Sequence, residues 1–271
     1  VEALDHRHLR AFLDRASRAR SSVLITGESG TGKDVIAIKG KSLSGDWLDG
    51  YSETLSSLAK SLDVSGGTPA PERVAIVGNL YDRNEGDHRA NVRHMRALLE
   101  GLGLTVTSIW LDGGSFADLA KIRDAGTILS FPYGRKAARS IAKRTGAALI
   151  ECPLPFGLTA TETWLRDVAS ALGRERELET VLDRELSAVI PSIEWVQHQL
   201  LQGRRWAYMG DPHLVVGLAG IAELVGAKLV LAVITNPPHH ARGLAEQLGE
   251  GVQLEIAPPR RSMNRLVGEA L

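Results

Sequence analysis

The strongest constraint on the fold is a regular alternation of short apolar runs and amphipathic stretches that begins at residue 73. The apolar runs are expected to be buried strands, and they cover 73–80, 104–111, 126–132 and 147–155. The amphipathic stretches are expected to be helices, and they cover 91–103, 116–125, 134–146 and 159–173. Parallel strands need a crossover connection that is usually helical, so this order predicts βαβ units. The sequence therefore predicts an α/β fold, with a parallel sheet covered by helices on both faces.

A second, shorter alternation follows a long helical stretch at 174–203, which we expect to be interrupted at Pro191 because proline lacks a backbone N–H. Further strands are expected at 205–212, 228–235 and 252–258, with helices at 213–226 and 239–249. The order strand, glycine, loop, helix occurs at Gly78 and again at Gly210. We therefore predict two Rossmann-like parallel-sheet units, the second incomplete, joined by a long helical region.

The predicted domain organisation has four parts. They are a short P-loop-like N-terminal fragment (1–39), a first Rossmann-like domain (40–173), a helical connector (174–203) and a partial second Rossmann-like domain (204–271). Before the alternation begins, helices are expected at 9–20 and 46–62, and the stretch SGGTPAPE at 65–72 is expected to be a linker.

Composition limits the partners of the chain. Lys plus Arg and Asp plus Glu each number 32, so no net field favours nucleic acid or an anionic membrane. The single cysteine, Cys152, cannot form an internal disulfide or hold an iron–sulfur cluster unaided, and it suits a reducing cytosol. The chain shows no signal peptide, and no apolar run approaches the ~20 residues needed to span a bilayer. We expect a cytoplasmic protein with neither a membrane nor a nucleic acid as its partner.

The stretch GESGTGKD at 27–34 has the spacing of a phosphate-binding P-loop and follows an apolar run at 23–26. Its glycines let backbone amides converge on a phosphate, its lysine reaches the β and γ phosphates, and an aspartate stands where Ser or Thr usually binds Mg²⁺. The candidate nucleotide-binding residues are Gly27, Gly30, Gly32, Lys33 and Asp34. The flanking runs are expected to be a strand before the loop and a helix that starts at the lysine.

The stretch RASRARSSVLITGESGTGKDVIA closely resembles the start of the ATPase domain of sigma-54-dependent transcriptional activators. The resemblance covers about residues 9–38 and implies phosphate contacts at Gly27, Gly32 and Lys33, with Asp34 in an acidic position of that family. It ends after Ala37, and no later strand closes in Asp-Glu to polarise a metal and a water molecule. Phosphoryl transfer depends on such positioning. We therefore expect weak or no ATP binding and no hydrolysis.

The rest of the chain, from about residue 40 to 271, resembles the nitrogenase component 1 superfamily, which includes the catalytic subunits of dark-operative protochlorophyllide reductase. The resemblance is carried by the stretches VAIVGNL, PFGLTATETWL and GDPHLVVGL, which occur in the order of the family. It implies Rossmann-like domains around a cleft that holds a metallocofactor or a tetrapyrrole. It also implies a paralogous subunit as a partner, and electrons delivered through an iron–sulfur cluster by an ATP-hydrolysing iron protein.

Two departures from the family concern cysteine ligands. The region whose cysteines hold the iron–sulfur cluster has no counterpart here, and Ser130 stands near the position of the cofactor-ligating cysteine of the nitrogenase α subunit. A serine hydroxyl is a poor substitute for a thiolate toward iron. Cys152 is either a remaining ligand or a small apolar filler at the end of a buried strand. No metal-ligand set is predicted.

The candidate cleft residues follow the strands, because ligands of open α/β sheets bind beyond the carboxyl ends of strands. These residues are Gly78, Asn79, Ser130, Tyr133, Gly157, Thr161, Gly210, Asp211 and His213. We expect the loops at Gly78, Ser130, Gly157 and Gly210 to face a shared cleft. For His213 the alternative is a helix-start residue without a ligand, and either Thr159 or Thr161 is a candidate N-cap of the helix at 159–173.

The main functional hypothesis is a nitrogenase component 1-like oxidoreductase subunit, or a fragment of one, which lacks its own iron–sulfur cluster and is inactive alone. One alternative is a non-redox protein that binds or scaffolds a metallocofactor or a tetrapyrrole. Another is an ATP-binding fragment of a sigma-54-type transcriptional regulator, for which the P-loop is the only support. The sequence leaves open whether the chain is itself an enzyme, which substrate it uses and how it oligomerises.

Overall fold

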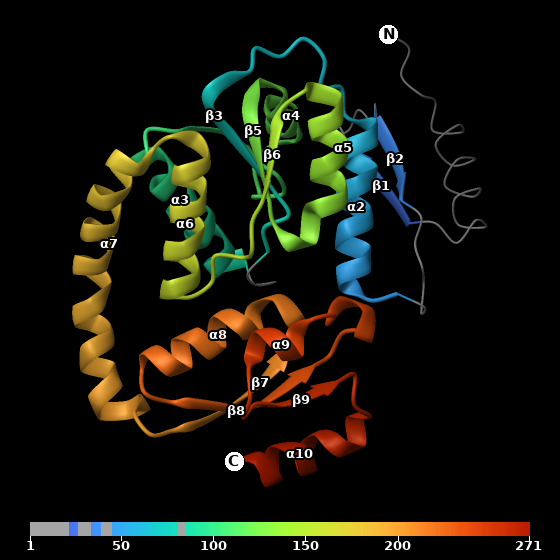
Figure 1. Ribbon diagram of the computed structural model, residues 1–271. Helices are drawn as coiled ribbons and strands as arrows, with labels where there is room; N and C mark the ends of the chain where they lie inside the picture. Colours follow the sequence, from blue (N-terminus) through green and yellow to red (C-terminus); the bar gives the residue numbers. More distant parts are fainter. Residues whose placement is uncertain (1–21, 27–33, 39–44, 81–84) are drawn as a thin grey trace. The chain divides into compact units, whose positions relative to one another are not determined.

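The computed structural model describes residues 22–26, 34–38, 45–80 and 85–271 (Figure 1). The chain divides into two compact units, each described here by itself. Unit 1 takes Val1–Arg96 and Leu104–Cys152, and unit 2 takes Ala97–Gly103 and Pro153–Leu271. Helix α6 (Leu158–Leu172), which the sequence analysis assigned to the first domain, belongs to unit 2. The three boundaries between the four predicted parts stay a prediction, since compact packing alone does not define them.

The sheet of unit 1 is parallel throughout, as predicted. It contains β3 (Ala70–Val77), β4 (Thr105–Ile109), β5 (Ala125–Ser130) and β6 (Ala148–Glu151), in the order β4-β3-β5-β6. Strand β3 therefore has a neighbour on both sides, and it begins inside the stretch that was expected to be a linker. Its last residue, Val77, lies opposite Ser130 of β5.

Helices α2 (Trp47–Ser61) and α5 (Arg135–Thr145) pack side by side in unit 1 (Figure 1). Their apolar residues form one core with the sheet; its largest members are Leu55, Leu58, Ile141, Ile128 and Trp110. Arg144 at the end of α5 fastens the two helices together, because its guanidinium donates to the carbonyl oxygens of Ala59 and Leu62. Those carbonyls lie in the last turn of α2 and at its C-cap, where the helix leaves them without backbone partners.

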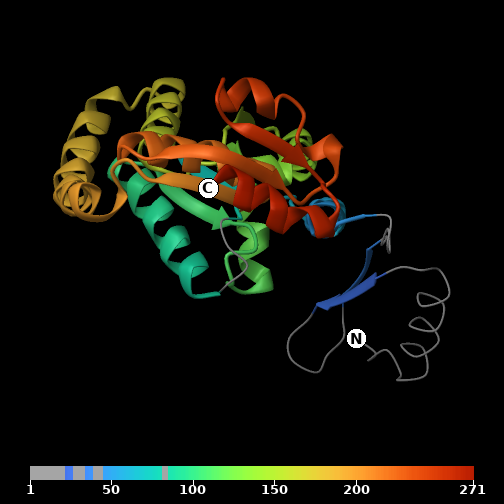
Figure 2. The ribbon, with the colours of Figure 1, turned by 90° about the horizontal axis from the view of Figure 1, so that it is seen from below.

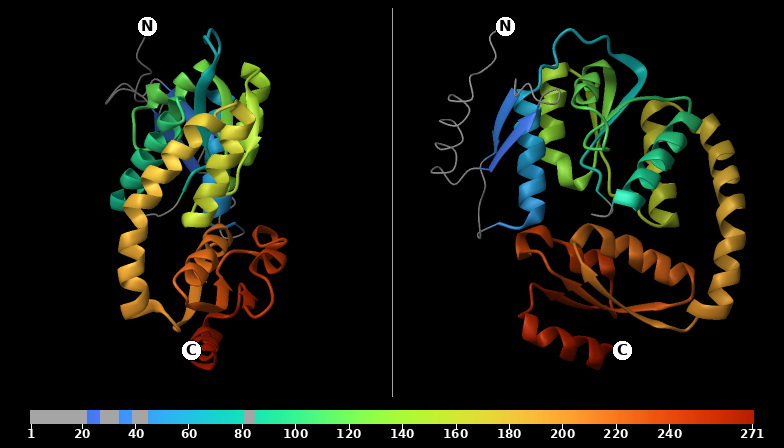
Figure 3. Two further views of the ribbon diagram at one scale, coloured as in Figure 1. Left: turned by 60° about the vertical axis from the view of Figure 1, so that its left-hand side comes forward. Right: turned by 180° about the vertical axis from the view of Figure 1, so that it is seen from behind.

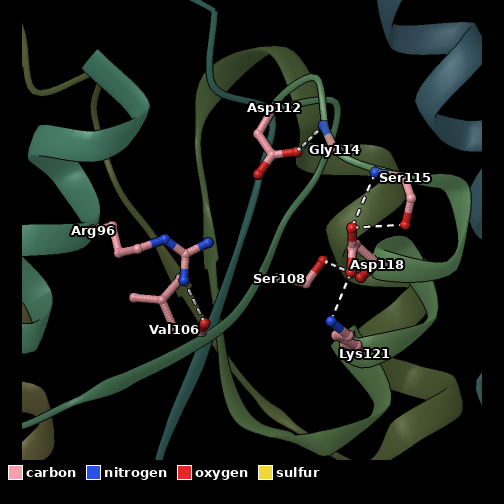
Figure 4. Close-up of polar contacts among 8 residues, drawn as sticks. All are labelled: Arg96, Val106, Ser108, Asp112, Gly114, Ser115, Asp118 and Lys121. Carbon is pink, nitrogen blue, oxygen red and sulfur yellow. Dashed lines mark hydrogen bonds and ion pairs between the residues drawn. The ribbon is translucent and has the colours of Figure 1, made fainter. Parts of the chain in front are cut away.

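The connection after β4 is built from short polar contacts (Figure 4). Asp118 of α4 (Phe116–Ala120) accepts hydrogen bonds from the backbone N–H and the hydroxyl of Ser115, and it forms an ion pair of 2.6 Å with Lys121. Lys121 opens a short 3₁₀ helix that ends at Asp124. Ser108 of β4 donates to the carbonyl oxygen of Asp118. The carboxylate of Asp118 therefore holds the start of α4 while its backbone is tied to the strand.

Helix α3 (Glu85–Gly101) starts earlier than the expected residue 91, and its Arg96 donates to the carbonyl oxygen of Val106 at 2.8 Å (Figure 4). A 3₁₀ turn, η3 (Pro132–Gly134), joins β5 to α5. Both observations add detail to the predicted alternation without changing it.

Unit 2 has a second parallel sheet, in the order β7 (Arg205–Gly210), β8 (Lys228–Ile234), β9 (Gln253–Ile256). Helices α8 (Pro212–Leu224) and α9 (Leu244–Leu248) cover one face, and α10 (Met263–Ala270) covers the other (Figures 1 and 3). Successive residues of β8 are buried on opposite faces of the sheet: Ala232 packs in the core with α8, whereas Leu231 packs in the core with α10. This alternation is what a strand buried on both faces requires.

Three features of unit 2 differ from the expectations. Helix α7 (Glu175–Val196) continues through Pro191 and ends in a π-helical turn, η4 (Gln197–Leu201), so the predicted interruption is wrong. The N-cap of α6 is Gly157 and not a threonine. Helix α10 was not predicted, and short 3₁₀ turns, η5 (Pro238–His240) and η6 (Arg260–Ser262), precede α9 and α10. Among the described residues, no helix is long and apolar enough to cross a membrane.

The N-terminal region corrects one prediction. Strand β1 (Ser22–Thr26) is present as expected, but 34–38 form a second strand, β2 (Asp34–Ile38), that pairs with it antiparallel, with Thr26 opposite Asp34 (Figure 2). The expected helix after the glycine-rich loop is therefore wrong at these residues. The sequence DVIAI is rich in β-branched residues, which favour strands. Residues 9–20 and 27–33 lie outside the described part of the chain.

Replacing Gly78 by alanine should destabilise the fold strongly. Gly78 has φ of +88°, and a Cβ atom there would lie 2.2 Å from the backbone nitrogen of Gly134. Left-handed backbone strain and overpacking together should cost about 3 kcal/mol in the free energy of unfolding, measured by chemical denaturation. Gly50→Ala is the matched control, since a Cβ there meets nothing within 4 Å in helix α2 and should stabilise slightly. Equal stability of the two variants would contradict the tight contact.

The Asp118→Asn variant should change how stability depends on pH. Hydrogen bonds from Lys121 and Ser115 lower the pKa of Asp118 from 3.8 to about 2. Because the folded pKa is depressed, the carboxylate stabilises the fold above pH 3.8, and this contribution is lost as the pH falls toward 2. We expect the variant to be less stable at neutral pH and its stability to vary less over that acidic window. Parallel stability curves for the wild type and the variant would show that the charge plays no part.

Candidate functional site

The carboxyl ends of β3 and β5 form the topological switch point of the unit 1 sheet. After β3 the chain continues to its neighbour β4 on one side, and it then returns to β5 on the other side. The two connections therefore leave the end of the sheet in opposite directions, and ligands of open α/β sheets bind at this point. Gly78 and Asn79 follow β3, and Ser130 ends β5. We call Asn79 and Ser130 the switch-point pair.

The backbone around the switch-point pair is packed closely. Gly78 and Gly134 approach each other so nearly that neither has room for a side chain, and the N–H of Phe131 donates to the carbonyl oxygen of Val77 at 2.9 Å. These contacts extend the β3–β5 ladder by one hydrogen bond and turn the chain into α5. The ends of both strands are thereby held in fixed positions.

A group of three aromatic rings is linked to the backbone of Asn79 through Tyr51. Tyr51 on α2 donates its hydroxyl to the carbonyl oxygen of Asn79 at 3.0 Å. The Tyr133 ring meets that of Tyr51 edge-on at a centroid separation of 6.2 Å and lies 6.3 Å from the ring of Trp47. Burial raises the pKa of Tyr51 above its ordinary value, so the phenol stays protonated and remains a donor. The sequence analysis missed Tyr51, although its spacing of four residues from Trp47 places both rings on one face of a helix.

Among the residues that the structure describes, the polar side chains of the switch-point pair have no hydrogen-bond partner. Both residues have no exposed surface, yet the amide oxygen and nitrogen of Asn79 and the hydroxyl of Ser130 are unbonded. About nine in ten buried polar groups in native proteins are paired, so such a cluster is unusual. Leaving these groups unpaired costs about 1–3 kcal/mol each, which a suitable ligand could recover.

The charged groups nearest to this edge are already engaged. Arg135 donates to the carbonyl oxygens of Ser130 and Cys152 and lies 3.8 Å from Glu151, while Arg139 bonds Glu151 at 2.6 Å. Burial lowers the pKa of Arg135, and the hydrogen bond from Arg139 lowers the pKa of Glu151. The guanidinium of Arg135 therefore connects the end of β5 to the residue after β6, and its hydrogen bonds to these two carbonyls serve a structural role.

The donor set at the switch point does not fit an iron–sulfur cluster. Such clusters are held by thiolates, and the only cysteine of the chain is Cys152. Cys152 is 2% exposed, its N–H donates to the carbonyl oxygen of Ser130, and its sulfur lies 3.7 Å from the carbonyl oxygen of Ile150. The remaining groups are an amide and a hydroxyl, which are poor ligands for soft iron. No chemical step is therefore derived through a cluster held by this chain.

In unit 2, the residues after β7 form a helix start. The carboxylate of Asp211 accepts from the N–H of His213 at 2.8 Å and caps α8, while Tyr208 donates to the carbonyl oxygen of Asp211 at 2.8 Å. Burial, together with the charge of Asp211, raises the pKa of Tyr208. Gly210 precedes the cap and accepts from the N–H of Thr235. This arrangement explains Asp211 by N-capping, which needs no ligand.

Gly157 and Thr161 take part in a helix contact of unit 2. Gly157 has φ of +89°, and a Cβ atom on it would lie 3.0 Å from the carbonyl oxygen of Gly217 in α8. The hydroxyl of Thr161 donates to the carbonyl oxygen of Gly157 at 2.7 Å. Small residues therefore allow the start of α6 to approach α8 closely.

The structure thus groups the predicted cleft residues within each unit. Gly78, Asn79, Ser130 and Tyr133 surround the switch point of unit 1, whereas Gly157, Thr161, Gly210, Asp211 and His213 lie at helix starts of unit 2. That all of them face one shared cleft stays a prediction. Of the nucleotide candidates, Gly27, Gly30, Gly32 and Lys33 lie outside the described residues, and Asp34 is the first residue of β2.

Parallel sheets with helical crossovers and a polar switch point define a Rossmann-like α/β protein. More specifically, the chain belongs to the family described as nitrogenase component 1 type oxidoreductase, whose sequence model matches residues 10–269. The match confirms the resemblance and begins before residue 40, so it includes the glycine-rich stretch. It does not separate that stretch from the rest of the chain as a piece of an activator ATPase.

Individual relatives agree with the family. The chain is 26% identical over 188 residues to light-independent protochlorophyllide reductase subunit N of Halorhodospira halophila, covering 68% of this chain and 41% of the relative. It is 26% identical over 220 residues to the nitrogenase vanadium-iron protein beta chain of Trichormus variabilis, covering 74% and 45%. The chain thus spans less than half the length of these relatives. A solved structure, nitrogenase Cp1 at pH 6.5, shares the fold, with a TM-score of 0.64, 19% identity, and coverage of 83% of this chain and 52% of that chain.

Removing the guanidinium of Arg135 should loosen the strand ends at the site. Arg135→Leu removes the side-chain donor of the Cys152 carbonyl oxygen and one of the two donors of the Ser130 carbonyl oxygen, which should lower the free energy of unfolding by about 2–3 kcal/mol. Arg139→Leu is the control, because Arg139 bonds the same Glu151 from a side chain that is 63% exposed and should cost less than about 1 kcal/mol. Urea denaturation of the three proteins measures both effects. If Arg139→Leu lowers the free energy of unfolding as much as Arg135→Leu does, the structural role given to Arg135 is wrong.

Proposed function

We propose that this chain is a ligand-holding part of a nitrogenase component 1-like oxidoreductase. The observation that carries the proposal is the switch-point pair, Asn79 and Ser130, which offers unbonded polar groups where α/β sheets of this type bind ligands. Family membership supplies the reaction class. Aromatic rings and a fixed strand end beside the pair supply a rigid setting for a bound ligand.

The proposed electron source lies outside the chain. A single buried cysteine supports a subunit that has no cluster of its own. By the family resemblance, an ATP-hydrolysing iron protein supplies the electrons and a paralogous subunit carries the cluster, in a cytoplasmic setting. On this proposal the residues of the chain bind and orient the ligand, exclude water from it and hold protons at Tyr51, while the chain alone is inactive.

The second candidate is a protein that binds a tetrapyrrole or another cofactor without redox chemistry. It is favoured by the presence of Ser130 near the position of the ligating cysteine and by the engagement of Cys152 in the ladder between β5 and β6. Such a protein would keep the ligand site of the family and would have no partner that supplies electrons.

Nucleotide binding by a sigma-54-type regulator fragment is the weakest candidate. A P-loop relies on a helix whose amino end points at the phosphate. Because β2 replaces that helix at 34–38, the proposal is that ATP binding at Gly27, Gly32 and Lys33 is weak or absent.

Reconstitution separates the first two candidates. The purified chain should reduce neither acetylene nor a tetrapyrrole when it is given only the ATP-hydrolysing iron protein and a reductant. Addition of a cluster-bearing paralogous subunit should restore reduction, and Asn79→Leu should lower the rate at least about tenfold if the pair contacts the ligand. Ser187→Ala, on the exposed middle of α7, is the control and should leave the rate unchanged.

Two outcomes would contradict the oxidoreductase proposal. Ligand binding without reduction in the presence of every partner would favour the non-redox candidate. Reduction by the isolated chain, with stoichiometric iron found after anaerobic purification, would show that the chain holds a cluster and that the proposed external electron source is wrong.

A further inference from the structure

The unbonded groups of the switch-point pair restrict the chemistry of a ligand. Asn79 offers one acceptor and two donor hydrogens, and Ser130 offers a hydroxyl that can donate or accept. Both side chains are completely buried, so bulk water does not satisfy them. The described residues supply no hydrogen-bond partner to either side chain, so a ligand that pairs with them has to offer both a donor and an acceptor.

The two residues come from adjoining strands, so one ligand can meet both. Val77 is paired with Ser130 across the β3–β5 ladder, and Asn79 follows Val77 by two residues. Ser130 lies two positions after Ile128 and therefore on the same face of the sheet, where Ile128 packs in the core of α2 and α5. The carbonyl oxygen of Asn79 is bonded to Tyr51 of α2. The pair is thus held between the sheet edge and the helices of one face.

The charged side chains at the start of α5 are already engaged in ion pairs or hydrogen bonds. Arg135 is occupied by two backbone carbonyls and by Glu151, and Glu151 is bonded to Arg139. Farther along the same helices, Lys136 pairs with Glu53 at 3.5 Å. Each of the three cations named here has a partner, so none of them is unpaired for an anionic ligand. A carboxylate offers only acceptors and would leave the amide oxygen of Asn79 without a donor.

We propose that the switch-point pair binds an uncharged organic group that presents a hydrogen-bond donor beside an acceptor, as a primary amide or a lactam does. The N–H of such a ligand donates to the amide oxygen of Asn79, and its carbonyl oxygen accepts from the amide nitrogen of Asn79. The second lone pair of the ligand carbonyl then accepts from the hydroxyl of Ser130. The rings of Tyr51 and Tyr133, which meet edge-on near the backbone of Asn79, add apolar surface that suits an uncharged organic group. The inference deepens the proposed function, since it names a ligand class for the same site, but binding is tested without electron transfer.

The test is titration of the ¹⁵N-labelled full chain with 2-pyrrolidone, a lactam, followed by the side-chain amide resonances of Asn79. We expect a saturable shift of these resonances. Cyclopentanone, which only accepts, and acetate, which is charged, should bind at least about fivefold more weakly, as expected for the loss of a hydrogen bond. The Asn79 resonances are assigned by their absence in Asn79→Leu.

Two further variants test the same binding if Asn79→Leu proves unstable. Ser130→Ala removes only the hydroxyl and should weaken 2-pyrrolidone binding about fivefold. Ser187→Ala on α7 should leave it unchanged. If acetate binds as tightly as the lactam, if Ser130→Ala has no effect, or if the Asn79 resonances do not move and a crystal structure places only water beside them, the inference is wrong. Lactam binding together with failed reconstitution would reject the proposed function and leave this inference standing.

Discussion

An inner strand of a parallel sheet has to bond a neighbour along both edges, and β3 and β5 are the two inner strands of the unit 1 sheet. The pairing of β3 with β5 places Val77 opposite Ser130, and one further hydrogen bond, from Phe131 to Val77, continues the ladder beyond the strands. The close approach of Gly78 and Gly134 is possible only because neither residue has a side chain. The polar pair and the start of α5 follow directly from the joined ends of β3 and β5, and the rings on α2 contact the chain there.

Much of the fold could be predicted because buried parallel strands are short apolar runs separated by amphipathic helices. The strands of both sheets follow this rule. The N-terminal hairpin did not, because a glycine-rich motif suggested a helix where Val35 and Ile36 favour a strand. Helix α10 was missed although Met263, Leu266 and Ala270 have helical spacing. Helix α7 continues through Pro191, where the sequence alone predicts a break, although its buried residues, Leu178, Val181 and Leu182, all lie in its first half.

The site could be predicted only in part, for a different physical reason. Positions such as Asn79 and Ser130 follow from the rule that strands of α/β sheets present ligands at their carboxyl ends. Whether a side chain there is free or bonded depends on groups distant in sequence, and no local pattern reveals it. Asp211 illustrates this, because its position suggested a cleft residue and its hydrogen bond to His213 shows a helix cap. Tyr51, nearly 30 residues before Asn79 in the chain, was invisible for the same reason.

Membership in a family does not transmit its chemistry automatically, because reactivity resides in particular residues and the fold only positions them. Here the parallel sheet of the family is present, and the groups at its switch point that have no hydrogen-bond partner among the described residues are neutral oxygen and nitrogen atoms. The shared fold therefore does not by itself tell which chemistry these residues support.

Helix α3 has a consequence for how this chain can be divided. Its residues up to Arg96 belong to unit 1, while Ala97–Gly103 belong to unit 2, where Gly101 lies against Val181 of α7. The polypeptide therefore passes between the units three times, and no single cut yields two intact halves. A gene truncated after Cys152 would encode the last turn of α3 without the helix that it packs on. Splitting the chain at that boundary would therefore separate the end of α3 from the α7 residue against which it lies.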